Sequence, residues 1–260
     1  MLATGLAAAG RTVVVDTGPR LSSPWPSWTA GQEAGGLAAL PADQALTRTQ
    51  VQQAAALQRP AAGPGWQVLT DGRDWHSPPL PLVSDPAAWY QLAAIGGWQV
   101  VIADTTHPVA HDVLDSRCAG RTSQTRGWCD LPYAIPVLCA AATSSGIQAL
   151  QQAVMALNAE GLPLHRAVAV LVATTDGRLP AVVRAGATML TPRTAAVVHL
   201  PHDPHIRAHG LREPARLRPR TRQAAAQLAS AVLAAAFAAW GQTLPDAPCP
   251  APLSAAVPAL

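Results

Sequence analysis

The sequence predicts an α/β fold with a three-layer, mostly parallel, doubly wound sheet. Helical segments with recognisable caps separate short runs of apolar and β-branched residues, and this alternation is typical of parallel sheets covered by helices. Apolar residues make up 49% of the 260-residue chain and charged residues 13%, which supplies a core and excludes a charge-rich disordered protein. The apolar runs lie at residues 12–15, 66–69, 100–103, 135–140, 167–172 and 195–200.

The first half of the chain begins with a predicted helix, Leu2–Ala9, which Gly10 ends, and a strand, Thr12–Val15. Residues 20–36 are rich in Pro, Ser, Gly and Trp, so we expect a loop there. Asp85 caps the helix before the Val100 strand, with Pro86 at its first position. The remaining elements predicted here are a helical turn at Leu37–Leu40, a helix at Asp43–Leu57, a strand at Trp66–Leu69 and a helix at Pro86–Ile95.

The second half starts with Val100–Ala103, a short apolar run predicted to be a strand buried on both faces. Residues 119–130 are polar and contain glycine, so we expect a loop. Residues 1–241 are expected to form one domain, and the Pro- and Ala-rich residues 242–260 a disordered tail. Helices are predicted at Val109–Arg117, Gly146–Glu160, Leu179–Leu190 and Pro219–Trp240.

Composition bears on the cellular location and the possible partners of the protein. All 18 basic residues are Arg, and their densest run, Arg207–Arg222, is expected to be a solvated face, with a nucleic-acid or acidic-membrane patch as the alternative. The four cysteines show no CxxC pairing, which favours reduced thiols in a cytoplasmic protein. The N-terminus does not have the pattern of a signal peptide. Ala224–Trp240 is alanine-rich and suits a packed helix better than a membrane span.

Two aspartates stand where predicted parallel strands end. Asp16 follows the Thr12–Val15 strand, and Asp104 follows Val100–Ala103. Ligands of open α/β sheets bind outside the carboxyl ends of the strands, so we expect both carboxylates at one edge, facing a shared cleft. A carboxylate there can hold Mg²⁺ through water, or it can simply cap a turn or helix.

Four stretches, in this order and spacing, carry a family resemblance. They are Leu6–Asp16, a helix end, one-glycine turn and strand closing on Asp; Gly97–Asp104, a second such strand; Pro136–Thr143, a strand leading into a helix; and Leu200–Pro204, with sequence Leu-Pro-His-Asp-Pro. Together they resemble the MinD/ParA group of P-loop ATPases, in the divergent form common in actinobacteria, over roughly Leu2 to Ala236.

The resemblance implies a P-loop NTPase-like fold that uses ATP and Mg²⁺ in partition, positioning or secretion. Asp16 would assist the metal and the attacking water near the γ-phosphate, and Asp104 would orient Mg²⁺ through water. Pro201, His202 and Asp203 would lie near the adenine base of the bound nucleotide. A homodimer, a nonspecific DNA partner and a protein partner are the associations it implies.

The sequence also departs from that family. The phosphate loop would precede Leu2, and the chain contains no Lys to contact a phosphate. Residues 173–175 are Ala-Thr-Thr, at a place where the family often has an Asn that contacts the nucleotide base. We therefore expect a truncated ATPase without activity as written; the alternative is a non-catalytic interaction module on a degenerate NTPase scaffold. The first, central strand would be missing, which predicts a split sheet, closure of its neighbours or pairing with another chain.

Other chemistries have weaker support. His199, His202, His205 and His209, and a second set of His107, His111, Cys118 and Cys129, match no established zinc spacing, so ordinary loop histidines are the favoured interpretation. Ser144-Ser145-Gly146 lacks the G-x-S-x-G pattern of a nucleophilic hydrolase. Its hydroxyls, with Thr143, are better explained as a helix cap.

Overall fold

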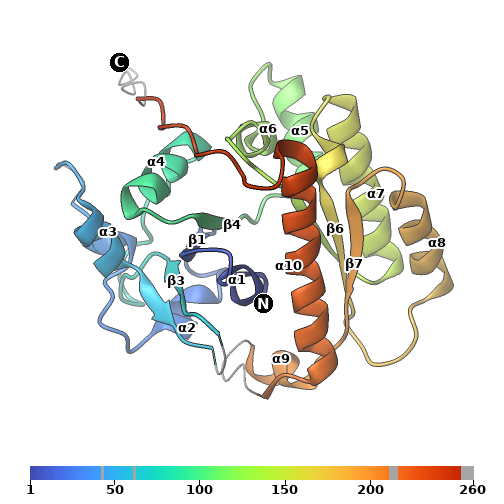
Figure 1. Cartoon of the computed structure of the whole chain (residues 1–260), viewed down its shortest axis with the longest axis horizontal. Helices are drawn as coiled ribbons and strands as arrows, with labels where there is room; N and C mark the ends of the chain where they lie inside the picture. The colour runs from blue at the N-terminus through green and yellow to red at the C-terminus, as the bar shows by residue number, and fades with distance from the viewer. Residues whose placement is uncertain (42–43, 61–62, 211–215, 253–260) are drawn as a thin grey trace.

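The computed structural model describes residues 1–41, 44–60, 63–210 and 216–252. The chain has an α/β fold of mostly parallel strands, compatible with a Rossmann-like layout, but its strands form two sheets (Figure 1). The four-stranded sheet has the order β2 (Ala56–Gln58), β3 (Trp66–Leu69), β1 (Thr12–Asp16), β4 (Val100–Asp104). The three-stranded sheet has the order β5 (Val137–Ala141), β6 (Val168–Val172), β7 (Ala196–Leu200). Neighbouring strands are parallel, except that β2 is antiparallel to β3.

Helices cover both faces of the four-stranded sheet. Val13 and Val15 pack with α3 (Arg48–Ala54) and α4 (Pro86–Gly96) on one face. Val14 faces the other way, toward α1 (Leu2–Leu6) and α2 (Trp25–Thr29). Successive strand residues point to opposite faces, so the continuous apolar run of β1 is what a strand buried between two helical layers requires.

The three-stranded sheet has the same layered construction. Ala169 and Leu171 pack with α7 (Ser144–Ala159) and α8 (Ala181–Leu190) on one face. Val168 and Val170 pack on the other face with α10 (Pro219–Trp240), and Leu6 of α1 joins that cluster. The three-layer prediction is therefore confirmed in each sheet, whereas the single continuous sheet is not.

The outer strands β4 and β5 are where the sheet divides. Among the described residues, β4 pairs only with β1, and β5 only with β6. Val100, Ile102 and Val137 nevertheless pack against the same core cluster, beneath α1 and α10. Among the described residues the strands therefore form two sheets instead of one.

Burial of β4 differs from the prediction. Val100–Ala103 was expected to be buried on both faces, but Val101 is 42% exposed and its neighbours are only partly buried. The reason is that a second neighbouring strand does not cover this part of β4 among the described residues. By contrast β1, with strands on both sides, is buried throughout.

Four short helices and strands were not predicted, and one of them is the helix at Pro204–His209, which Asp203 caps. The expected loop at 20–36 contains α2, and the expected loop at 119–130 contains α6 (Gln124–Cys129), which Ser123 caps. The helix predicted at Asp43–Leu57 begins at Arg48, because Thr47 and Gln50 form a capping box, and gives way to β2 after Ala54. Its predicted start, Asp43, lies outside the described residues.

The remaining elements include α5 (Val109–Cys118), α9 (Pro204–His209) and two short 3₁₀ turns, Leu37–Ala39 and Leu164–Arg166. The α10 helix is long and apolar enough to cross a membrane by length and composition alone. One side of it, however, packs into the core, where Ala224, Leu228 and Ala229 are buried.

The tail predicted to be disordered, residues 242–260, is described by the structure as far as residue 252. Residues 242–252 contain neither helix nor strand, but they cross the surface from the end of α10 to α4 (Figure 1). Tyr90 and Tyr133 donate hydrogen bonds to backbone carbonyls of this segment. Residues 253–260 lie outside the described residues.

Candidate functional site

Asp16 and Asp104 end neighbouring parallel strands and are direct register partners, β1 to β4. Parallel pairing places the carboxyl ends of both strands at one edge of the sheet. The prediction that the two aspartates share an edge is therefore confirmed. Thr17, the residue after β1, donates from both its backbone N–H and its hydroxyl to the carbonyl of Asp104, which ties the two strand ends together.

The Asp16 carboxylate is buried among hydroxyl groups. Its Oδ2 accepts hydrogen bonds from the Thr70 hydroxyl at 2.6 Å and the Ser23 hydroxyl at 2.8 Å, and Oδ1 accepts from the Gly18 N–H at 3.2 Å. Burial raises the pKa of Asp16, the nearby charge of Asp104 adds to that rise, and the three hydrogen bonds oppose it. A carboxyl that is costly to ionise, placed at a sheet edge, is a candidate functional group.

Asp104 has a different environment. It is exposed, and its Oδ2 accepts a hydrogen bond from the indole N–H of Trp25 at 2.6 Å. Trp25 belongs to α2 and packs edge-on against Trp28 and Trp66. An exposed carboxylate beside a buried one can take a hydrated cation while its neighbour accepts or donates a proton.

Sequence reasoning missed the partners of these aspartates. Trp25 and Ser23 lie in the segment expected to be a plain loop, and Thr70 directly follows the strand predicted at Trp66–Leu69. The clustered tryptophans of 25–28 were the available signal, because neighbouring indoles bury a large apolar area when they pack together.

The second group of predicted residues follows β7. Asp203 is buried and accepts hydrogen bonds from the His205 N–H at 2.9 Å, the Arg218 N–H at 2.9 Å and the Thr221 hydroxyl at 2.7 Å. Although burial raises the pKa of Asp203, these three bonds outweigh it and lower the pKa overall. Both oxygens are thus engaged in capping α9 and fastening it to the start of α10.

His202 lies in a charged corner beside Asp203. Its Nδ1 is 3.4 Å from an oxygen of Asp176, which follows β6. The same Asp176 oxygen accepts a hydrogen bond from Arg220 at 2.7 Å, and this bond lowers the pKa of Asp176. Arg220 and Arg218, from the dense arginine run, therefore pair within the chain.

The two groups of predicted residues are connected through α2. Trp25 holds Asp104, and its ring contacts Trp28 at a centroid distance of 5.1 Å. Trp28 in turn lies against Gly210, at the end of α9: a Cβ built on that glycine would stand 2.6 Å from the Trp28 ring. The carboxyl edges of the two sheets are thus joined by a short chain of packed aromatic residues.

The predicted helix cap is confirmed at α7, where the Thr143 hydroxyl accepts a hydrogen bond from the Gly146 N–H at 3.1 Å. The histidines have other contacts. His205 and His209 stack on α9 with ring centroids 5.0 Å apart, and His107 Nε2 is 3.1 Å from the Thr125 hydroxyl. Within the described ranges, no group of three His, Cys, Asp or Glu side chains is placed to hold a metal.

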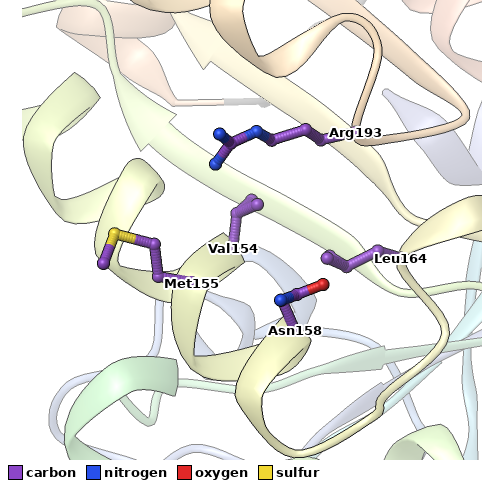
Figure 2. Close-up of a pocket in the computed structure, with 5 residues that line it drawn as sticks. All are labelled: Val154, Met155, Asn158, Leu164 and Arg193. Atoms are coloured by element: carbon purple, nitrogen blue, oxygen red, sulfur yellow. The ribbon is translucent and has the colours of Figure 1, made fainter.

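A cavity lies away from these residues. It has a volume of about 390 Å³ and is lined by Val154, Met155, Asn158, Leu164 and Arg193. Figure 2 shows its floor on α7, with the Arg193 side chain reaching across the apolar side chains from the turn after α8. None of the predicted site residues lines this cavity.

Comparison with known proteins gives no family assignment: no protein-family model matches the chain, and no curated protein matches it.

Proposed function

We propose that this chain is a MinD/ParA-like, ATPase-related protein of partition, positioning or secretion type, acting in the cytoplasm. The observation that carries the proposal is the register pairing of Asp16 with Asp104 at the carboxyl edge of parallel strands. Nucleotides of open α/β folds bind at this edge. Two neighbouring carboxylates are the groups that Mg²⁺ and an attacking water need there.

The two aspartates have separate roles in this proposal. Asp104 is exposed, and the Trp25 indole fixes its Oδ2, which leaves Oδ1 to orient Mg²⁺ through a bound water. Asp16 is buried beside it and is positioned by the hydroxyls of Thr70 and Ser23. This fixed orientation at the sheet edge suits a group that positions the attacking water near a γ-phosphate.

The base of the nucleotide is assigned to the loop after β7. Pro201 and His202 lie at the carboxyl end of that strand, and Asp176 and Arg220 hold His202 in place. Asp203, which the sequence also suggested for this site, has both oxygens occupied by protein donors. In this proposal Asp203 positions the loop that faces the base, just as the three donors to Asp16 position that carboxylate.

The chain as written is expected not to hydrolyse ATP. Phosphoryl transfer depends on a loop that cradles the phosphates and neutralises their charge, and the sequence has no Lys to contribute. The edges of β4 and β5 that lack a partner among the described residues are where a further parallel strand carrying such a loop would fit. ATP and Mg²⁺ are the cofactors only of that completed sheet.

The experiment is steady-state phosphate release by the 260-residue chain with ATP and Mg²⁺. We expect a rate equal to the buffer blank. Release clearly above the blank, and abolished by Asp104→Ala, would show that this polypeptide is a complete ATPase and would contradict the proposal.

A second candidate is a non-catalytic interaction module. The open edges of β4 and β5 favour it, since an exposed strand edge is a template for pairing with another chain. A homodimer, a DNA partner and a protein partner remain proposals in either case. The codons in frame before Met1 discriminate the two: a glycine-rich loop ending in Lys-Ser or Lys-Thr supports the ATPase, and its absence supports the module.

A further inference from the structure

The segment after α10 is held against the body of the protein by an ordered set of donors. Tyr90 donates its hydroxyl to the carbonyl of Pro248 at 2.6 Å, and the neighbouring Gln91 amide donates to the carbonyl of Ala251. Tyr133 donates to the carbonyl of Asp246 at 3.4 Å. Three side chains thus donate hydrogen bonds to backbone carbonyls of one short segment, residues 244–252.

The spacing of these carbonyls fits a polyproline II helix. Residues 244–252 contain four prolines, which restrict φ and remove backbone donors. A polyproline II helix has three residues per turn, so Pro248 and Ala251, three apart, present their carbonyls on one side. Tyr90 and Gln91 are adjacent on α4 and face that side with two donors. Proline-rich ligands are commonly recognised in this way, by aromatic residues that bond to backbone carbonyls.

Backbone strain is concentrated at the same place. Within the described residues, two non-glycine residues have a positive φ, Tyr133 at 56° and Thr243 at 83°. Tyr133 lies between the tail and Trp240, whose ring it meets edge-on at 5.2 Å. Thr243, with Gly241 at 94°, turns the chain back after α10. Strained residues persist only where surrounding contacts hold them, and they cluster at ligand clamps and switches.

We propose that Tyr90, Gln91 and Tyr133 form a recognition surface for a proline-rich segment, and that residues 244–252 of the same chain occupy it as a detachable strap. The strap joins α4, which covers the four-stranded sheet, to the segment that leads into β5 of the other sheet (Figure 1). Its residues are almost all exposed, so hydrogen bonds rather than burial hold it. Such a strap can be displaced by a second proline-rich chain.

The test uses the full chain, because its two tyrosines are both on the surface in question. Labelling with 3-fluorotyrosine gives one ¹⁹F signal for each. With the exposed Cys118 and Cys139 changed to Ser, a nitroxide attached to Cys249 marks the strap, since Cys129 is buried. We expect the nitroxide to broaden both signals, most strongly that of Tyr90, and dilution with unlabelled chain to leave the broadening unchanged. Two sharp signals, or broadening that dilution removes, would overturn the assignment to the chain's own tail.

A second set of experiments tests whether this surface recognises the proline-rich sequence of the strap. Gln91→Ala should weaken broadening of the Tyr90 signal, whereas Gln53→Ala, an exposed glutamine of α3, should not. Pro248→Ala with Pro250→Ala, outside the core, should weaken it equally. A synthetic peptide of residues 242–252 should restore the signals, and one with every Pro replaced by Ala should need a roughly tenfold higher concentration. Equal effects of both peptides, or no effect of either, would refute recognition of a proline-rich chain.

Discussion

At the scale of single residues, the two aspartates share an edge but differ in what the fold does to them. Asp104 is exposed and has one indole partner, whereas Asp16 is buried and has three donors. Burial of an ionisable carboxyl reduces stability when the group is charged. A fold that keeps Asp16 there in spite of this cost is expected to gain stability when the charge is removed.

The first prediction is that Asp16→Asn gains stability relative to the unchanged protein as pH rises, by on the order of 1 kcal/mol in the free energy of unfolding. The pKa of Asp16 is raised above 3.8 in the fold, so the folded state keeps its proton to a higher pH than the unfolded state. The contribution of Asp16 to stability is present below 3.8 and is lost as pH rises through the folded pKa. Urea unfolding from pH 3.5 to pH 7.5 should therefore show the gain of the variant appear as pH rises. A stability difference between the two proteins that is equal at every pH, or that moves against the variant as pH rises, would contradict this account.

Asp203 gives the second prediction. Asp203→Ala leaves two backbone donors and the buried Thr221 hydroxyl without an acceptor, and each such group costs about 1–3 kcal/mol. We expect a loss of roughly 2–4 kcal/mol in the free energy of unfolding after partial relaxation. Asp176→Ala is the matched control, since that carboxylate is exposed and should change stability much less. Equal losses in the two variants would show that Asp203 does not hold α9 to α10.

At the scale of elements, the sequence predicted those whose pattern is long enough to be unambiguous. The α10 helix was predicted with its observed ends, because flanking Pro and Gly residues and a helical apolar period mark it. The strands β1, β3 and β6 were predicted within one residue, because short runs of apolar and β-branched residues mark them. The short α2, α6, α9 and β2 were missed. Helices of five or six residues and a strand of three residues have too few positions to show a period, and tertiary contacts such as those of Trp25 decide their conformation.

The third prediction concerns the contact of α1 with α10. A Cβ on Gly5 would stand 2.5 Å from the Cβ of Ala229, so the two helices approach at a point where only glycine fits. Overpacking costs about 1–3 kcal/mol, and the better helix propensity of Ala returns at most about 1 kcal/mol. Thermal unfolding of Gly5→Ala should therefore show a net loss, while Ser230→Ala, on the exposed side of α10, should show none. An unchanged midpoint for Gly5→Ala would mean that α1 does not pack closely on α10.

At the scale of the whole molecule, the position of the aspartates was predictable and their surroundings were not. Parallel strands place their carboxyl ends together, so Asp16 and Asp104 could be located from strand pattern alone. Sequence alone could not show that the Ser23 and Thr70 hydroxyls bond to Asp16, or that Asp203 holds α9 to α10. These contacts form between loops that are distant in sequence and meet only in the folded chain. The order of the strands likewise depends on which edges find partners, which a single sequence does not encode in any local pattern.

The last prediction concerns the division between β4 and β5, and it tests the central claim most directly. We compare thermal unfolding of the 260-residue chain with that of a chain extended before Leu2 by a strand and a phosphate loop, each with and without ATP and Mg²⁺. The short chain should be marginally stable and indifferent to nucleotide. The extended chain should be more stable, and ATP with Mg²⁺ should stabilise it further, by about 2.7 kcal/mol at a hundredfold excess over Kd, unless Asp104 is changed to Ala. A short chain that unfolds cooperatively at high temperature, unchanged by extension and by nucleotide, would contradict the account and identify a self-sufficient fold without a nucleotide site.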